Sequence, residues 1–224
     1  LPNRFSTTDL VPLLQMFQHV KLTQQSSNML TGRNDDTTVL QRWKRLMQLS
    51  MSLSEILLDK HENIVSQLHF KLLMEVSKHQ KEEYYQLQHI AWSIKTEAGD
   101  EDFIRTCLQL YHRIYEGSYR IGITYVRMLL DLSDNKNFKI TSIEGYLKTD
   151  VRNTLNLLPK SSLLSDGEKN LLSYGVNSIV RNAVAHGGSV LREGRAYLED
   201  KSQRVSFGAE DMQPLVSDLL ITSE

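Results

Sequence analysis

Hydrophobic residues recur every three or four positions through most of the chain, a spacing that places them on one face of an α-helix. The most regular run, residues 104–132, keeps this period for about eight turns and predicts the longest helix. Its stripe consists of Ile104, Cys107, Leu108, Tyr111, Ile114, Tyr115, Ser118, Ile121, Tyr125, Met128, Leu129 and Leu132. Because the tyrosines share this stripe, we expect them at the rim of a core.

Similar patterns predict helices on both sides of this run. We expect one helix around residues 10–20, two or three between 36 and 94, a short one from Ile143 to Leu158 that Pro159 ends, and a last one around 212–219. Polar connections are expected at 23–37 and 96–102. The second connection, around Gly99, predicts a boundary between an N-terminal helical region, 1–98, and a C-terminal helical bundle, 99–224.

The segment before residue 187 carries signals for both ends of a helix. Ser165 and Glu168 have the spacing of a capping box, so the helix should begin at Asp166. Gly187 and Gly188 tolerate a positive φ and should stop it close to His186. Its apolar stripe is Leu171, Leu172, Gly175, Val176, Ile179, Val180, Ala183 and Val184.

A β-hairpin is expected directly after this helix. Residues 190–192 and 196–198 read as short strands around a Glu193–Gly194 turn, and Val205 and Phe207 extend them to a third strand. The sequence therefore predicts a mostly α fold, a helical bundle with a small β-hairpin after the helix 166–186.

Charge and cysteine content narrow the classes of function. The 224 residues hold 26 Lys and Arg against 27 Asp and Glu, and a net charge of −1 argues against nucleic-acid binding through bulk charge. A small basic excess lies at Arg181, Arg192, Arg195, Lys201 and Arg204.

The single cysteine, Cys107, excludes a disulfide within the chain and favours a buried thiol in a reducing, cytoplasmic setting. We expect no membrane segment and no signal peptide; the first residue is Leu, which favours a processed or partial chain.

The most informative chemistry lies at the end of the helix 166–186. Arg181, Asn182 and His186 combine a fixed positive charge, an amide and a group that titrates near neutrality. This set suits attack of a ribose 2′-hydroxyl on the adjacent phosphate, which needs a base, an acid and a clamp on negative charge, and no metal or cofactor. Arg181 and His186 diverge around an ideal helix, so either the long arginine reaches back or a second copy of the chain completes the site.

The same residues also have interpretations without a catalytic role. A histidine at a helix C-terminus often binds the last carbonyls, and a lone arginine is usually a solvated charge. Arg105 and His112 form a second Arg–His spacing, which we rank low because it lies in mid-helix without a glycine stop. The histidines between residues 61 and 89 lack the spacing of a helical metal site.

Arg181-Asn182-x-x-x-His186, followed by two glycines and a hairpin, resembles the R-x4-6-H motif of HEPN domains over roughly residues 101–222. The resemblance implies a helical bundle, often homodimeric with a composite site, and in many members a metal-independent ribonuclease of toxin–antitoxin or abortive-infection defence. It further implies that Arg181 and His186 are catalytic, with Asn182 in support, and that RNA and an antitoxin or sensor are partners. We expect Arg192 and Arg195 to bind substrate. The alternatives are a non-catalytic HEPN-like module that binds a nucleotide or protein, and an unrelated helical scaffold.

Overall fold

The computed structural model describes residues 99–134 and 143–223, with short runs and single residues between 45 and 86. The elements are α3 (Asp100–Ile114), η1 (Tyr115–Tyr119), α4 (Arg120–Asp134), α5 (Ile143–Leu147), α6 (Val151–Leu157), η2 (Leu158–Lys160), α7 (Asp166–Leu172), α8 (Ser178–His186), β1 (Ser189–Arg192), β2 (Arg195–Asp200), β3 (Gln203–Gly208) and α9 (Ala209–Ser223). This confirms the mostly α fold with a small sheet near the C-terminus. The helix and loop expected before residue 38 lie outside the described residues.

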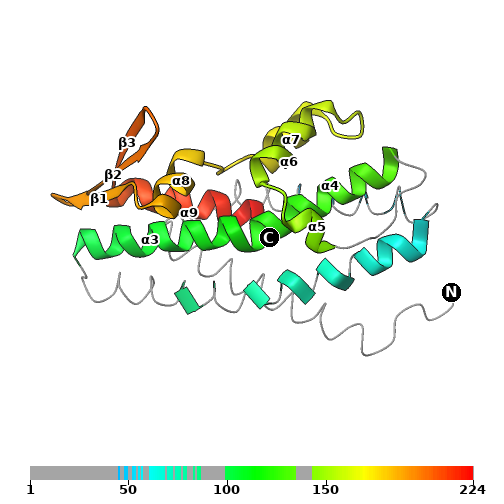
Figure 1. Ribbon diagram of the computed structural model, residues 1–224, viewed down its shortest axis with the longest axis horizontal. Helices are drawn as coiled ribbons and strands as arrows, with labels where there is room; N and C mark the ends of the chain where they lie inside the picture. The colour runs from blue at the N-terminus through cyan, green and yellow to red at the C-terminus, as the bar shows by residue number, and fades with distance from the viewer. Residues whose placement is uncertain are drawn as a thin grey trace.

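The long helix expected at 104–132 is confirmed, and it runs as α3, η1 and α4 along the length of the molecule (Figure 1). Its stripe is the centre of the core, where Tyr111, Ile114 and Leu129 are completely buried. The tyrosines therefore lie inside the core rather than at its rim. Cys107 is buried as expected, and burial raises the pKa of its thiol to about 12.

One turn of this helix, η1, is a π turn that the sequence pattern did not predict. Gly117 at its centre has φ −98° and ψ −109°, outside the helical region. A Cβ at Gly117 would lie 2.6 Å from Oε1 of Glu83, so the close approach of this side chain requires glycine. Glu83 is 3% exposed and accepts hydrogen bonds from the backbone N–H and the hydroxyl of Ser118. The turn thus closes around a buried carboxylate.

The prediction of a single helix from Asp166 to His186 is wrong, because the structure divides this segment into α7 and α8. The start at Asp166 and the capping box of Ser165 and Glu168 are confirmed. The break occurs at Gly175, which has φ +79° and a backbone that packs directly on α9. The apolar spacing on both sides of Gly175 gave no sign of this interruption.

Buried tyrosines of the long helix hold the connection between α7 and α8. The hydroxyl of Tyr111 donates to the carbonyl of Gly175 at 3.0 Å and accepts from the N–H of Asn177 at 2.6 Å. The Tyr119 hydroxyl donates to the carbonyl of Leu172. Asn177 in turn caps α8, because its side chain accepts from the first free backbone N–H groups of that helix. The start of α8 is therefore fixed on α3.

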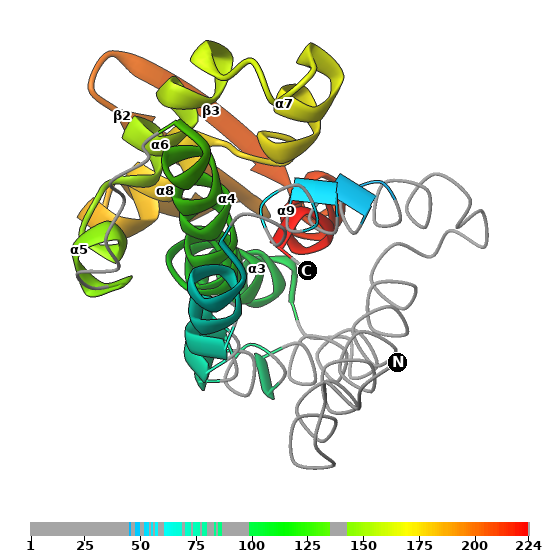
Figure 2. The same ribbon diagram turned by 90° about the vertical axis from the view of Figure 1, so that its right-hand side faces the viewer.

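The expected hairpin and third strand are confirmed as an antiparallel sheet in the order β1-β2-β3. Its first turn has positive φ at both Glu193 and Gly194, which is the geometry of a primed two-residue turn. The sheet packs against α8 and α3, and α9 returns along α3. Figure 2 looks along the long helix and shows these elements gathered on one side of it.

The short helix expected from Ile143 to Leu158 is also divided in the structure. It consists of α5 and α6, and Asp150 between them caps α6 by accepting from the N–H of Arg152 at 3.0 Å. Pro159 lies in the one-turn helix η2 that follows α6. The break places Lys148 and Asp150 beside the junction of η1 and α4.

The described residues bear on two further expectations, the absence of a membrane segment and the domain boundary near Gly99. Among the described residues, none of the helices has the length and apolarity needed to cross a lipid bilayer. Leu49, Leu57 and Leu68 of the N-terminal region belong to the same hydrophobic core as the long helix. The boundary near Gly99 therefore does not separate two cores among the described residues, and its status as a domain boundary stays a prediction.

Candidate functional site

Arg181 on α8 is held in one orientation by contacts to its whole guanidinium group. Its Nε and Nη2 lie 2.7 and 2.6 Å from Oε1 of Glu116, and its Nη1 donates to Oδ1 of Asn182 at 2.9 Å. The group also lies 5.7 Å from the centre of the Tyr115 ring, within range of a cation–π contact. Burial alone would lower the pKa of Arg181, but the hydrogen bond and charge of Glu116 outweigh it and raise the pKa.

Glu116, the last residue before Gly117, holds a second arginine as well. Nη1 of Arg120 lies 3.2 Å from its Oε2, and Nη2 of Arg120 donates to the backbone carbonyl of Leu147. Nε of Arg120 is buried and has no acceptor among the described residues. One carboxylate thus fixes two guanidinium groups, from α4 and α8, and leaves an excess of positive charge.

These charged side chains form the wall of a pocket of about 200 Å³. It is lined by Glu116, Arg120, Lys148, Asp150, Val151 and Arg181, which come from the long helix, the α5–α6 break and α8. Three of the six residues are cationic and two are acidic, so the pocket favours an anion. Neither the spacing in the sequence nor the composition indicated this cluster, because its members lie up to 65 residues apart.

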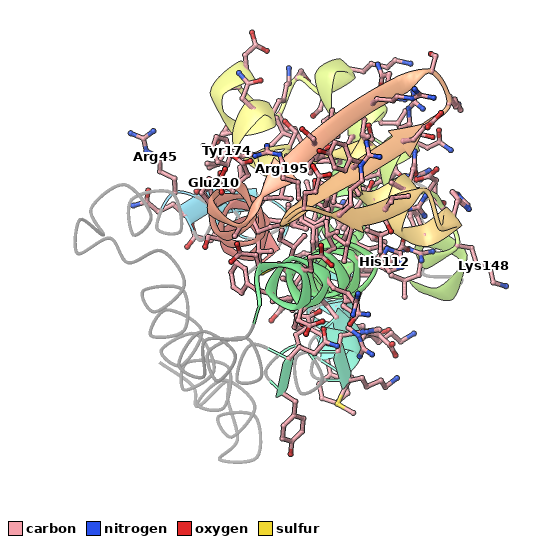
Figure 3. All side chains as sticks on the ribbon, turned by 90° about the vertical axis from the view of Figure 1, so that its left-hand side faces the viewer. Arg45, His112, Lys148, Tyr174, Arg195 and Glu210 are labelled. Carbon is pink, nitrogen blue, oxygen red and sulfur yellow. The ribbon has the colours of Figure 1, made fainter. Side chains whose placement is uncertain are left out.

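His112 is a further titratable group near Arg181. It lies on α3, one turn before Glu116, and its buried Nδ1 has no hydrogen-bond partner among the described residues. Burial lowers its pKa, the charge of Glu116 acts in the opposite direction, and those of Arg181 and Arg113 lower it further. The net effect is a pKa below the ordinary value for histidine. Figure 3 shows His112 on the same side of the molecule as Lys148.

The structure separates the second Arg–His pair noted in the sequence. Arg105 forms an exposed ion pair with Asp102 at 3.0 Å, one turn away on α3. His112 instead lies within electrostatic range of Arg181 and Glu116. Arg105 thus has a surface ion pair of its own, and the low ranking of the Arg105–His112 pair as a site stays a prediction.

Asn182 connects Arg181 to the sheet. Its Nδ2 donates to Oδ2 of Asp200, at the end of β2, at 2.8 Å, while its Oδ1 accepts from Arg181. Asn182 therefore bridges Arg181 and Asp200, and its supporting role in catalysis stays a prediction. Its side chain is uncharged and acts on the site through the position of Arg181.

His186 is the last residue of α8, and the expected helix end is confirmed. It is exposed, and Gly187 after it has φ +71°, the left-handed conformation of a glycine cap. Arg181 and His186 share no hydrogen bond, and helix geometry places their Cα atoms about 9 Å apart and about 140° around the axis. The structure therefore does not bring these two side chains together within one chain.

The two arginines expected to bind substrate lie at the tip of the hairpin. Arg192 stacks 4.5 Å from the centre of the Tyr197 ring, and Arg195 lies 3.6 and 3.7 Å from Glu210 and Asp211. Figure 3 shows Arg195 beside Glu210 and well apart from His112 and Lys148. The structure does not bring them to Arg181, and their contact with substrate stays a prediction.

The position of the hairpin turn along α3 supports this separation. A Cβ at Gly194 would lie 3.5 Å from the side chain of Asp100, the first residue of α3. Glu116 follows 16 residues later, which corresponds to about 24 Å of helix. The Arg181 cluster and the hairpin tip are therefore two separate basic features.

Comparison with known proteins adds no further assignment. No protein-family model matches the chain, and no curated protein and no solved structure is significantly similar to it. Within the described residues, no group of three or more His, Cys, Asp or Glu side chains could hold a metal ion. The site is thus defined by its own geometry, a fixed arginine beside a charged pocket and an exposed histidine at the end of the same helix.

Proposed function

We propose that this protein is a metal-independent endoribonuclease of the HEPN type, with its centre at the end of α8. The observation that carries the proposal is the fixed guanidinium of Arg181 at the wall of a cationic pocket, with an exposed His186 on the same short helix. An arginine that is oriented before substrate arrives stabilises developing negative charge without reorganisation.

In this reaction a base takes the proton of a ribose 2′-hydroxyl, whose oxygen attacks the adjacent phosphorus. The bond from phosphorus to the 5′-oxygen breaks, and an acid gives that oxygen a proton, which leaves a 2′,3′-cyclic phosphate and a 5′-hydroxyl. His186 is one of the two proton carriers, and Arg181 stabilises the pentavalent phosphorane. Asn182 keeps Arg181 in place through its bond to Asp200.

The second proton carrier has two candidate sources. His186 of a second copy of the chain would supply it in a composite homodimeric site, which agrees with the divergence of Arg181 and His186 on α8. His112 would supply it within one chain, because its imidazole lies within electrostatic range of Arg181. A toxin or defence role, with an antitoxin or sensor as partner, follows from the HEPN resemblance alone.

The second candidate function is a non-catalytic module that binds a partner or a nucleotide. The observation in its favour is that all three nitrogens of Arg181 already have acceptors within the chain. A purely structural arginine would look the same. This alternative predicts that substitution of Arg181 lowers stability, and that neither the wild type nor the variant cleaves RNA.

Cleavage of RNA by the purified chain in EDTA distinguishes the two, beside Arg181→Ala and His186→Ala. We expect cyclic-phosphate products from the wild type and a loss of about 10²–10³ in rate for each variant, the usual effect of removing one such group. Arg204→Ala is the matched control, because Arg204 pairs with Glu199 on the exposed face of β3. Circular dichroism establishes that the variants fold. The proposal would be rejected if the wild type gave no such products, or if His186→Ala cleaved RNA at the rate of the wild type.

A further inference from the structure

The pocket beside Arg181 contains more positive charge than the proposed reaction uses. Arg181 is assigned to the scissile phosphate, but Arg120 and Lys148 line the same pocket and have no role in the chemistry. The whole protein has a net charge of −1, so this excess is local and not a reflection of a basic surface. A local excess at the wall of a pocket indicates a specific anionic ligand.

The two cations differ in how far they are engaged within the chain. Arg120 is fixed by Glu116 and by the carbonyl of Leu147, and its buried Nε has no acceptor among the described residues, so its charge is held at the wall of the pocket. Lys148 is exposed and forms no ion pair with any described residue. The carboxylate of Asp150, which lines the same pocket, already accepts from the backbone of α6. The positive groups are thus less satisfied than the negative ones.

The size of the pocket limits the ligand. Its volume of about 200 Å³ is below the roughly 300–1,000 Å³ of pockets that enclose a whole small molecule. Val151 is its one apolar lining residue, so it offers no surface on which a base could stack. These properties fit a single charged group whose remainder lies outside, such as one phosphate of a longer strand.

We infer that this pocket binds a backbone phosphate of the RNA strand, next to the scissile phosphate, with Lys148 and Arg120 as its ligands. The inference rests on the proposed function for the identity of the strand. It assigns to the α5–α6 break the task of presenting Lys148, and to Glu116 the task of spacing two guanidinium groups for neighbouring phosphates. Contacts of this kind position a nucleic acid without reading its bases.

The test is binding of an uncleavable 2′-O-methyl RNA oligomer to the full chain at several salt concentrations, measured by fluorescence anisotropy. We expect Lys148→Ala to weaken binding several-fold and to reduce the slope of log affinity against log salt by about 0.7–1, the share of one phosphate contact. Lys148→Arg should restore the slope. Lys160→Ala, an exposed lysine outside the pocket, should leave it unchanged.

A cleavage assay on the same variants keeps this inference separate from the proposed reaction. If RNA is cleaved, we expect Lys148→Ala to raise KM and to leave kcat unchanged. Cleavage by the wild type with a slope that Lys148→Ala does not change would overturn the pocket assignment alone. Binding that depends on Lys148 without any cleavage would support the pocket and reject the reaction. Binding of AMP through Lys148 that is tighter than binding of the oligomer would overturn the assignment to a strand.

Discussion

Two glutamates meet at the same π turn, and their surroundings differ in almost every respect. Glu83 is 3% exposed and takes its hydrogen bonds from Ser118, directly after Gly117. Glu116, directly before Gly117, has a side chain that is 27% exposed and lies between Arg120 and Arg181. One carboxylate is enclosed by the core, while the other faces a pocket.

The difference shows how one distortion of a helix can serve both the fold and a site. Burial raises the pKa of Glu83, and the hydrogen bonds from Ser118 only partly oppose it, so ionisation of this carboxyl group costs free energy in the folded chain. Glu116 keeps two arginines oriented where a ligand can reach them. We therefore interpret the Glu83 side of the π turn as part of the packed core and the Glu116 side as part of the functional site.

Replacing Gly117 should have the largest effect on this arrangement. Gly117→Ala puts a Cβ 2.6 Å from Oε1 of Glu83, and the buried carboxylate has little room to move. We expect a loss of about 1–3 kcal/mol in the free energy of unfolding, measured by chemical denaturation. Gly99→Ala is the control, because a Cβ there would contact nothing within 4 Å. Equal stability of the two variants would contradict the close packing of Glu83.

Glutamine substitutions of the two glutamates should change the free energy of unfolding in opposite directions, by smaller amounts. Glu116→Gln weakens the contacts to both arginines and should lower the free energy of unfolding by about 1 kcal/mol at pH 7. Glu83→Gln removes a buried charge and can keep a hydrogen bond to Ser118, so it should raise that free energy. Both are measured as denaturant midpoints.

The pH dependence gives the Glu83 prediction its control. The folded chain raises the pKa of Glu83 above its ordinary value of 4.5, so the contribution of this group to wild-type stability is full below pH 4.5 and is lost as pH rises through the folded pKa. The advantage of Glu83→Gln should therefore be small below pH 4.5 and grow above it. An advantage that shrinks as pH rises would show that burial is not the dominant influence on Glu83.

Local signals in the sequence were sufficient for much of the fold. The Glu193–Gly194 turn, the capping box before Asp166 and the helix end at His186 each depend on residues within a few positions of one another. The interruptions at Gly117 and Gly175 could not be predicted in this way. They depend on Glu83 and Tyr111, which lie 35 and 64 residues from the backbone that they contact.

The same limit applies to the candidate site. The sequence singled out Arg181, Asn182 and His186 because they form a local motif, and the structure gives Arg181 and Asn182 a common hydrogen bond. It could not indicate Glu116 as the partner of Arg181, because an acidic residue on a long amphipathic helix is usually solvated. The place of Lys148 beside the pocket was equally hidden, because it depends on the break between α5 and α6.

The most direct test of whether Arg181 serves chemistry rather than the fold is Arg181→Lys. Lysine keeps the positive charge beside Glu116 but lacks the planar fork that matches a phosphate. We predict a change of less than about 1 kcal/mol in the free energy of unfolding, with a fall of about 10²–10³ in the single-turnover rate of RNA cleavage in EDTA. Cleavage by Arg181→Lys within a few-fold of the wild type, or a loss of cleavage that only follows unfolding, would contradict the account.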